Sequence, residues 1–120
     1  MIDHLDHLVL TTAKESECID FYTRVLGMQL ESFASGTPPV ERRAFKFGNQ
    51  KINLHIQGKE FEPKAHLPVP GSPDLCFIAS TSLQEVMSML AKCNCPSLKG
   101  LLCAQARRRK SGLSMCAIRT

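Results

Sequence analysis

The order of the segments predicts an α+β fold, in which one strand, one helix and three strands are followed by another strand and helix. Three observations carry this prediction. Apolar residues alternate with a period of two in the strand segments, two stripes with helical spacing separate them, and a stretch rich in proline and glycine divides the chain. With 120 residues, of which 43% are hydrophobic, the chain is long enough for one domain with a core and too short for two ordinary domains.

The first strand and helix are expected over residues 5–25. In residues 5–10, Leu8 and Leu10 fall on one face of a strand, and His7 falls on the other. The helix that follows carries an apolar stripe at i, i+3, i+4 and i+7, formed by Cys18, Phe21, Tyr22 and Val25. Gly27 stands where a left-handed C-terminal cap is expected. This helix should therefore pack on the sheet through its stripe.

Three more strands are expected over residues 28–33, 41–47 and 51–56. Residues 34–40, with one glycine and two prolines, are predicted to be a loop. Arg43, Phe45 and Phe47 share one face of their strand, and the turn residues 48–50 connect it to the next. In that last strand, His55 lies opposite the aliphatic side chains. His7 and His55 can therefore meet on one face of the sheet.

The second half begins like the first and then departs from it. Residues 58–73 contain four prolines and are predicted to be a linker. A buried strand over 74–79 precedes a Ser82-x-x-Glu85 capping box, and the helical stripe is formed by Leu83, Val86, Met87 and Leu90. After Pro96 no alternating apolar pattern is evident, so the second module should stop after its first strand and helix.

The positive charge is confined to the end of the chain. The net charge is +4, but residues 98–120 hold six basic residues and no acid, so the first 97 residues carry −2. We therefore divide the chain into a domain over 1–97, with an incomplete second module from about residue 73, and a basic tail over 98–120 that is expected to be disordered. Four clustered charges without an aromatic platform do not predict nucleic-acid binding.

The apolar segments and cysteines favour a soluble protein of the cytoplasm. No run approaches the roughly 20 apolar residues that cross a bilayer, and no secretory signal pattern opens the chain, so no membrane partner is expected. The six cysteines are interpreted as reduced thiols rather than as a disulfide framework.

The motifs in their order resemble the glyoxalase/bleomycin-resistance family, also called the vicinal oxygen chelate superfamily. The resemblance covers residues 5–96 and is carried by the histidine strand around His7, the pair Phe21 and Tyr22, the segment 25–28 and the triplet 53–55. It implies paired βαβββ modules that curl into a cup around a divalent metal ion. It also implies a small-molecule substrate and, in some members, a homodimer that completes the cup.

The resemblance also implies metal ligands. His7 and His55 match the two ligand positions of the first module, and Asp74 falls where many members carry the histidine of the second module. The glutamate that usually completes the site has no counterpart, because Glu85 is the last acid in the chain. Taken alone, a histidine at either position is more typical of a locally hydrogen-bonded sheet residue than of a metal ligand. The ion could be Zn, Ni, Mn or Fe.

Three functions remain open at this point. The chain could be a metal-dependent enzyme domain of the lyase, isomerase or dioxygenase class, or a non-catalytic module that binds a small molecule. It could also be a truncated, inactive isoform, since the tail is interpreted as an alternative terminus or a segment translated in another frame.

Overall fold

A computed structural model describes residues 1–94 and 114–119, apart from the side chains of Asp74, Cys76 and Leu83 and all those of 114–119. The chain divides into two compact units, Met1–Ser72 and Pro73–Thr120.

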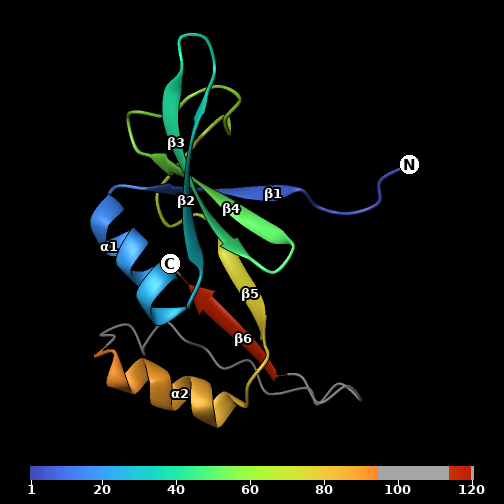
Figure 1. The fold of residues 1–120 in the computed structure, drawn as a ribbon, viewed down its shortest axis with the longest axis vertical. Helices are drawn as coiled ribbons and strands as arrows, with labels where there is room; N and C mark the ends of the chain where they lie inside the picture. The colour runs from blue at the N-terminus through green and yellow to red at the C-terminus, as the bar shows by residue number, and fades with distance from the viewer. Residues whose placement is uncertain (95–113, 120) are drawn as a thin grey trace. The chain divides into compact units, whose positions relative to one another are not determined.

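The first unit is a four-stranded mixed sheet with a helix on one face (Figure 1). Its strands are β1 (His7–Thr12), β2 (Gln29–Ser35), β3 (Val40–Phe47) and β4 (Gln50–Ile56), in the spatial order β1-β4-β3-β2. β1 runs parallel to β4, whereas β2, β3 and β4 form an antiparallel meander. The predicted α+β class and the βαβββ order are confirmed.

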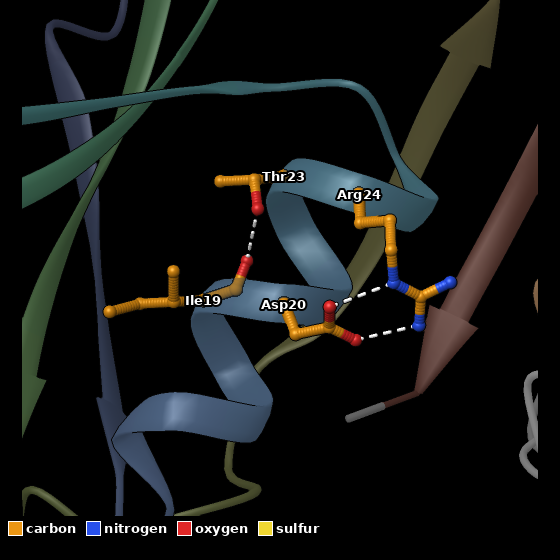
Figure 2. A network of polar contacts seen from close by, with 4 residues as sticks. All are labelled: Ile19, Asp20, Thr23 and Arg24. Carbon is orange, nitrogen blue, oxygen red and sulfur yellow. Dashed lines mark hydrogen bonds and ion pairs between the residues drawn. The ribbon is translucent and has the colours of Figure 1, made fainter.

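The helix between β1 and β2 changes its winding part-way along. The α-helix α1 (Glu15–Asp20) continues directly into the π-helix η1 (Phe21–Val25). The Thr23 hydroxyl donates to the Ile19 carbonyl at 2.7 Å, and the Asp20 carboxylate accepts from Arg24 at 2.8 and 2.7 Å (Figure 2). Such hydroxyl bonding to the preceding turn is a common cause of helix distortion. The sequence predicted a single regular helix here.

Gly27 ends the helix in the predicted way. Its φ of +73° lies in the left-handed region, where a side chain is unfavourable. The amide of Gly27 donates to the Thr23 carbonyl, and that of Met28 donates to the Tyr22 carbonyl, both at 3.0 Å. The chain can therefore turn directly into β2.

The hairpin between β2 and β3 is tighter than expected. Ala34 and Ser35 belong to β2 and Val40 to β3, so only residues 36–39 form the turn, although the sequence predicted a loop over 34–40. Residues 57–73 contain no helix or strand, as predicted for the linker.

The second unit contains β5 (Asp74–Ala79), α2 (Leu83–Lys92) and β6 (Ser114–Arg119). The capping box is present, since the Ser82 hydroxyl accepts from the Glu85 amide at 3.3 Å and the Ser82 amide donates to the Glu85 carboxylate at 2.8 Å. Leu90 is buried, but Met87 is exposed, so the buried stripe is narrower than predicted.

Residues 114–119, at the end of the predicted tail, form β6. It pairs with β5 in antiparallel register from Asp74–Arg119 to Ala79–Ser114. The short apolar run of residues 115–118 was not predicted to be a strand, although it is long enough to form one when a partner strand is available. The predicted tail residues 98–113 lie outside the described part of the chain.

Candidate functional site

The two faces of the four-stranded sheet are distinguished by the register of its strands. Residues that pair across strands point to the same face, and successive residues alternate. Leu10 and Arg43 both pair with Leu54, and this row lies on the side covered by the helix, which we call the helix face. Val9 and Ala44 both pair with Asn53 on the opposite side, which we call the polar face.

The centre of the helix face is a buried apolar core. Tyr22 of η1, which is 1% exposed, stacks on Phe45 of β3 with ring centroids 4.7 Å apart and planes 15° apart. Ile52 and Leu54 of β4 are buried beside them. Arg43 forms an ion pair with Glu15 of α1 at 2.5 Å. This packing fixes the strands and thereby the side chains of the other face.

His55 occupies a buried position on the polar face. Only 2% of it is exposed, and its ring lies 4.1 Å from that of Phe61, which comes from the linker. Burial lowers the pKa of His55, and the positive charge of Arg42 lowers it further. The imidazole is therefore held in its neutral form, with its Nδ1 atom lacking any hydrogen-bond partner.

Arg42 and Asn53 complete a cluster around His55. Arg42 stands one position beyond the Arg43–Leu54 pair, which places it next to His55. Its guanidinium carbon lies 3.9 Å from the centroid of the Phe61 ring. The Arg42 Nε and Asn53 Oδ1 atoms are buried and, like His55 Nδ1, have no hydrogen-bond partner within residues 1–94 and 114–119.

His7 lies on the same face as His55 but at the other end of the strands. His7 pairs with Lys51, whereas His55 pairs with Thr11, so their Cα atoms are four residues, or about 13 Å, apart along the strand direction. The Nδ1 atom of His7 lies 2.5 Å from the carboxylate of Asp6. This hydrogen bond from His7 is the main cause that lowers the pKa of Asp6. The sequence predicted the shared face but not this separation.

The predicted ligand Asp74 belongs to the second unit, where it begins β5. Its side chain lies outside what the structure describes.

The described residues do not by themselves fit a divalent ion. Among them, no group of three or more His, Cys, Asp or Glu side chains is arranged to hold a metal. His7 and His55 supply two nitrogen donors at most, and the Arg42 guanidinium beside His55 would repel a cation. A complete site would need further ligands.

Comparison with known proteins decides the family. Residues 4–93 match the Glyoxalase/Bleomycin resistance protein/Dioxygenase superfamily. The chain belongs to this superfamily. Its four-stranded sheet with β1 parallel to β4 is a single glyoxalase-type module, as the resemblance implied.

Two curated relatives are similar to most of the chain. It is 47% identical over 100 residues to Virulence protein STM3117 of Salmonella typhimurium, covering 83% of this chain and 66% of the relative. It is 52% identical over 86 residues to Glyoxalase domain-containing protein RDO1 of Mycosarcoma maydis, covering 72% and 46%. The chain thus spans less than two thirds of the length of each relative.

Solved structures show the same fold. The crystal structure of Virulence protein STM3117 superposes with a TM-score of 0.78 at 42% identity, covering 99% of this chain and 89% of that one. An integron cassette protein from the mobile metagenome of V. cholerae gives a TM-score of 0.71 at 42% identity, covering 94% and 82%. In the described part of this chain, no helix has the length and apolar character needed to cross a membrane.

Proposed function

We propose that the first unit binds a small molecule on the polar face of its sheet. One observation carries this proposal. Arg42 Nε, Asn53 Oδ1 and His55 Nδ1 come from two neighbouring strands, and on one face all three are buried without a partner in the described part of the chain. Buried polar groups in folded proteins nearly always have a hydrogen-bond partner. A ligand that enters this face would supply the missing partners.

The cluster offers complementary chemistry within one small area. Arg42 Nε is a donor, Asn53 Oδ1 is an acceptor, and the Nδ1 atom of a neutral His55 is either, depending on its tautomer. The Phe61 ring adds an apolar surface above them. A pocket of a few convergent polar groups beside an aromatic ring is typical of small-molecule sites.

A thermal-shift screen of small polar molecules, run with a chelator present, tests this proposal. We expect some compounds to raise the melting temperature of the wild-type protein and to lose this effect with Asn53→Leu, which removes one of the three polar groups. Gln29→Leu, at the exposed start of β2, is the matched control and should keep the effect. Compounds that stabilise both variants equally would contradict the proposal.

A metal-dependent enzyme is the second candidate function, and the orientation of His7 favours it. A carboxylate on one ring nitrogen commonly fixes a histidine so that the other nitrogen can bind a metal. Asp6 stands in this relation to His7. The proposed ligands are His7, His55 and Asp74, for Zn, Ni, Mn or Fe, in a lyase, isomerase or dioxygenase. Because the described donors are incomplete, this candidate requires ligands from a second copy of the chain or from elsewhere in this one.

Metal analysis of the purified protein separates the two candidates. The enzyme requires bound metal that disappears in the His7→Ala/His55→Ala double variant. The control His4→Ala/His66→Ala removes the same number of imidazoles outside the strands and should retain the metal. Equal metal content in the wild-type protein and the first double variant would leave the binding module as the function. Gel filtration of the same samples shows whether metal retention accompanies a dimer.

A further inference from the structure

We propose that the ligand of the polar face is a small hydroxycarboxylic acid, whose carboxylate is held by Arg42 beneath the Phe61 ring. This inference rests on the proposed small-molecule binding and adds the chemical class of the ligand.

The first argument is the contrast between Arg42 and its neighbours along β3. Arg43 lies against the carboxylate of Glu15 at 2.5 Å, and Lys46 against that of Glu31 at 3.1 Å. For Arg42, no carboxylate lies within ion-pair distance among the described residues. Its polar contact is a long one, 3.5 Å, from Nη2 to the carbonyl of Glu62. A partly buried guanidinium without an anion is unfavourable, so this position lacks a negative partner.

The second argument is the charge around the cluster. Arg42, His7 and Lys64 are the basic groups that act on His55, and Glu60 is the acid. The Glu60 carboxylate is already engaged, since it accepts from the Gly58 amide at 3.0 Å. The surroundings therefore leave a positive charge that a carboxylate can balance, and arginine binds carboxylates through two parallel hydrogen bonds.

The third argument concerns the groups beside the guanidinium. Asn53 Oδ1 accepts a hydrogen bond and has no donor to fill it. A hydroxyl group next to a carboxylate supplies this donor. The oxygen of the same hydroxyl group can accept a hydrogen bond from His55. If the side-chain amide of Asn53 is rotated so that its nitrogen and oxygen exchange positions, the hydroxyl oxygen can accept from the Asn53 amide nitrogen instead. A carboxylate without a hydroxyl would satisfy Arg42 alone.

Phe61 determines how such a ligand enters. Its ring lies against both Arg42 and His55, and the buried polar atoms beneath have almost no solvent contact. Phe61 belongs to the linker, which has no helix or strand, whereas the cluster below it belongs to the sheet. The linker is therefore the element that must move when the carboxylate reaches Arg42.

Matched acids and amides test the proposal on the full chain. Binding of glycolate and mandelate is measured by titration calorimetry beside that of glycolamide and mandelamide, which keep the hydroxyl group and lose the charge. We expect each acid to bind at least about tenfold more tightly than its amide, in line with the strength of charge-assisted hydrogen bonds. Acetate, which lacks the hydroxyl, should bind more weakly than glycolate.

Two neighbouring arginines provide the matched variants. Arg42→Gln should lower acid affinity about tenfold or more and abolish the preference for acid over amide. Arg43→Gln makes the same change of charge one residue away on the helix face, and should alter acid affinity less than about twofold. Arg42→Lys, which keeps the charge and loses the planar fork, guards against misfolding and should fall between the wild-type protein and Arg42→Gln.

Movement of the linker can be followed by the fluorescence of a single introduced tryptophan, because the chain contains no tryptophan of its own. In Phe61→Trp, glycolate should shift the emission to longer wavelength as the indole leaves the cluster, and glycolamide should not.

The outcomes separate this inference from the proposed function. Equal affinity for acids and amides, or equal effects of the two arginine variants, would overturn the carboxylate assignment. If neutral compounds still bound in an Asn53-dependent manner, small-molecule binding at the polar face would stand. Absence of binding by any compound would reject both.

Discussion

The two faces of the four-stranded sheet are built from alternate residues of the same strands, yet they differ in how completely their side chains are satisfied. On the helix face, Phe45 stacks on Tyr22 and Arg43 pairs with Glu15. One residue away, on the polar face, Arg42 Nε and His55 Nδ1 are buried and have no hydrogen-bond partner among the residues that the structure describes. The helix face thus accounts for stability, and the polar face keeps unused hydrogen-bonding capacity for a ligand.

The largest expected effect comes from truncating the helix face. Phe45→Ala should lower the free energy of unfolding by about 3–5 kcal/mol, because it empties the centre of the apolar core. Its neighbour Lys46 is exposed on the other face, and Lys46→Ala should change stability by less than about 1 kcal/mol. Urea denaturation of both variants makes the measurement. Similar losses would mean that the two faces contribute equally to stability.

The next effect concerns the helix that covers this face. Gly27→Ala should cost about 1–2 kcal/mol, because its φ of +73° disfavours any side chain. A Cβ atom at Gly27 would meet no atom within 4 Å, so the cost is conformational rather than steric. Gly27→Asn should cost less, since asparagine tolerates the left-handed region. Equal losses in urea denaturation would point to a different cause.

A smaller effect, an increase in stability, is expected when an unpartnered polar group is removed from either face, but only the polar face should lose ligand binding. Tyr22 OH is buried without a partner on the helix face, so Tyr22→Phe should raise stability by about 1 kcal/mol and leave ligand binding unchanged. Asn53→Leu should also raise stability, by a similar amount, but at the expense of binding. Calorimetric melting and the ligand screen, run together, check this. Loss of binding in Tyr22→Phe would place the site elsewhere.

The smallest perturbation uses the wild-type protein, in which the reactivity of the Cys18 thiol reports how well the helix face excludes water. Burial raises the pKa of Cys18 to about 11 from 9.0. A raised pKa keeps the thiol protonated, so at pH 9 about 1% of it is thiolate in the folded protein, against about half in the unfolded chain. Alkylation of Cys18 by iodoacetamide at pH 9 should therefore be about fifty-fold slower before urea is added, as measured by peptide mass spectrometry. Equal rates would show that water reaches this side of the sheet.

Much of the fold followed from local patterns in the sequence. The alternation around Leu54 and Phe45 predicted the strands, and Gly27 and Ser82 marked helix ends correctly because their chemistry acts within a few residues. The π-helix was not predictable, since η1 carries the same apolar spacing as an α-helix. β6 was missed because a run of four apolar residues becomes a strand only when it finds a partner.

The candidate site was only partly predictable. Alternation placed His7 and His55 on one face, but their separation depends on the register of two parallel strands, which no short-range signal fixes. Arg42 was overlooked, although the sequence held a clue. The turn at residues 48–49 joins β3 to β4 so that Phe47 pairs with Gln50, and counting back from that pair brings Arg42 beside His55.

The parallel pairing of β1 with β4 also affects which strand joins the sheet last and which detaches first. β2, β3 and β4 are neighbours along the chain, whereas β1 reaches β4 only after a loop of nearly forty residues has closed. In the first unit β1 also forms one edge of the sheet. We therefore expect its amides to exchange with deuterium before those of β3, so that the strand carrying His7 can detach while the meander that holds Arg42 and His55 stays intact.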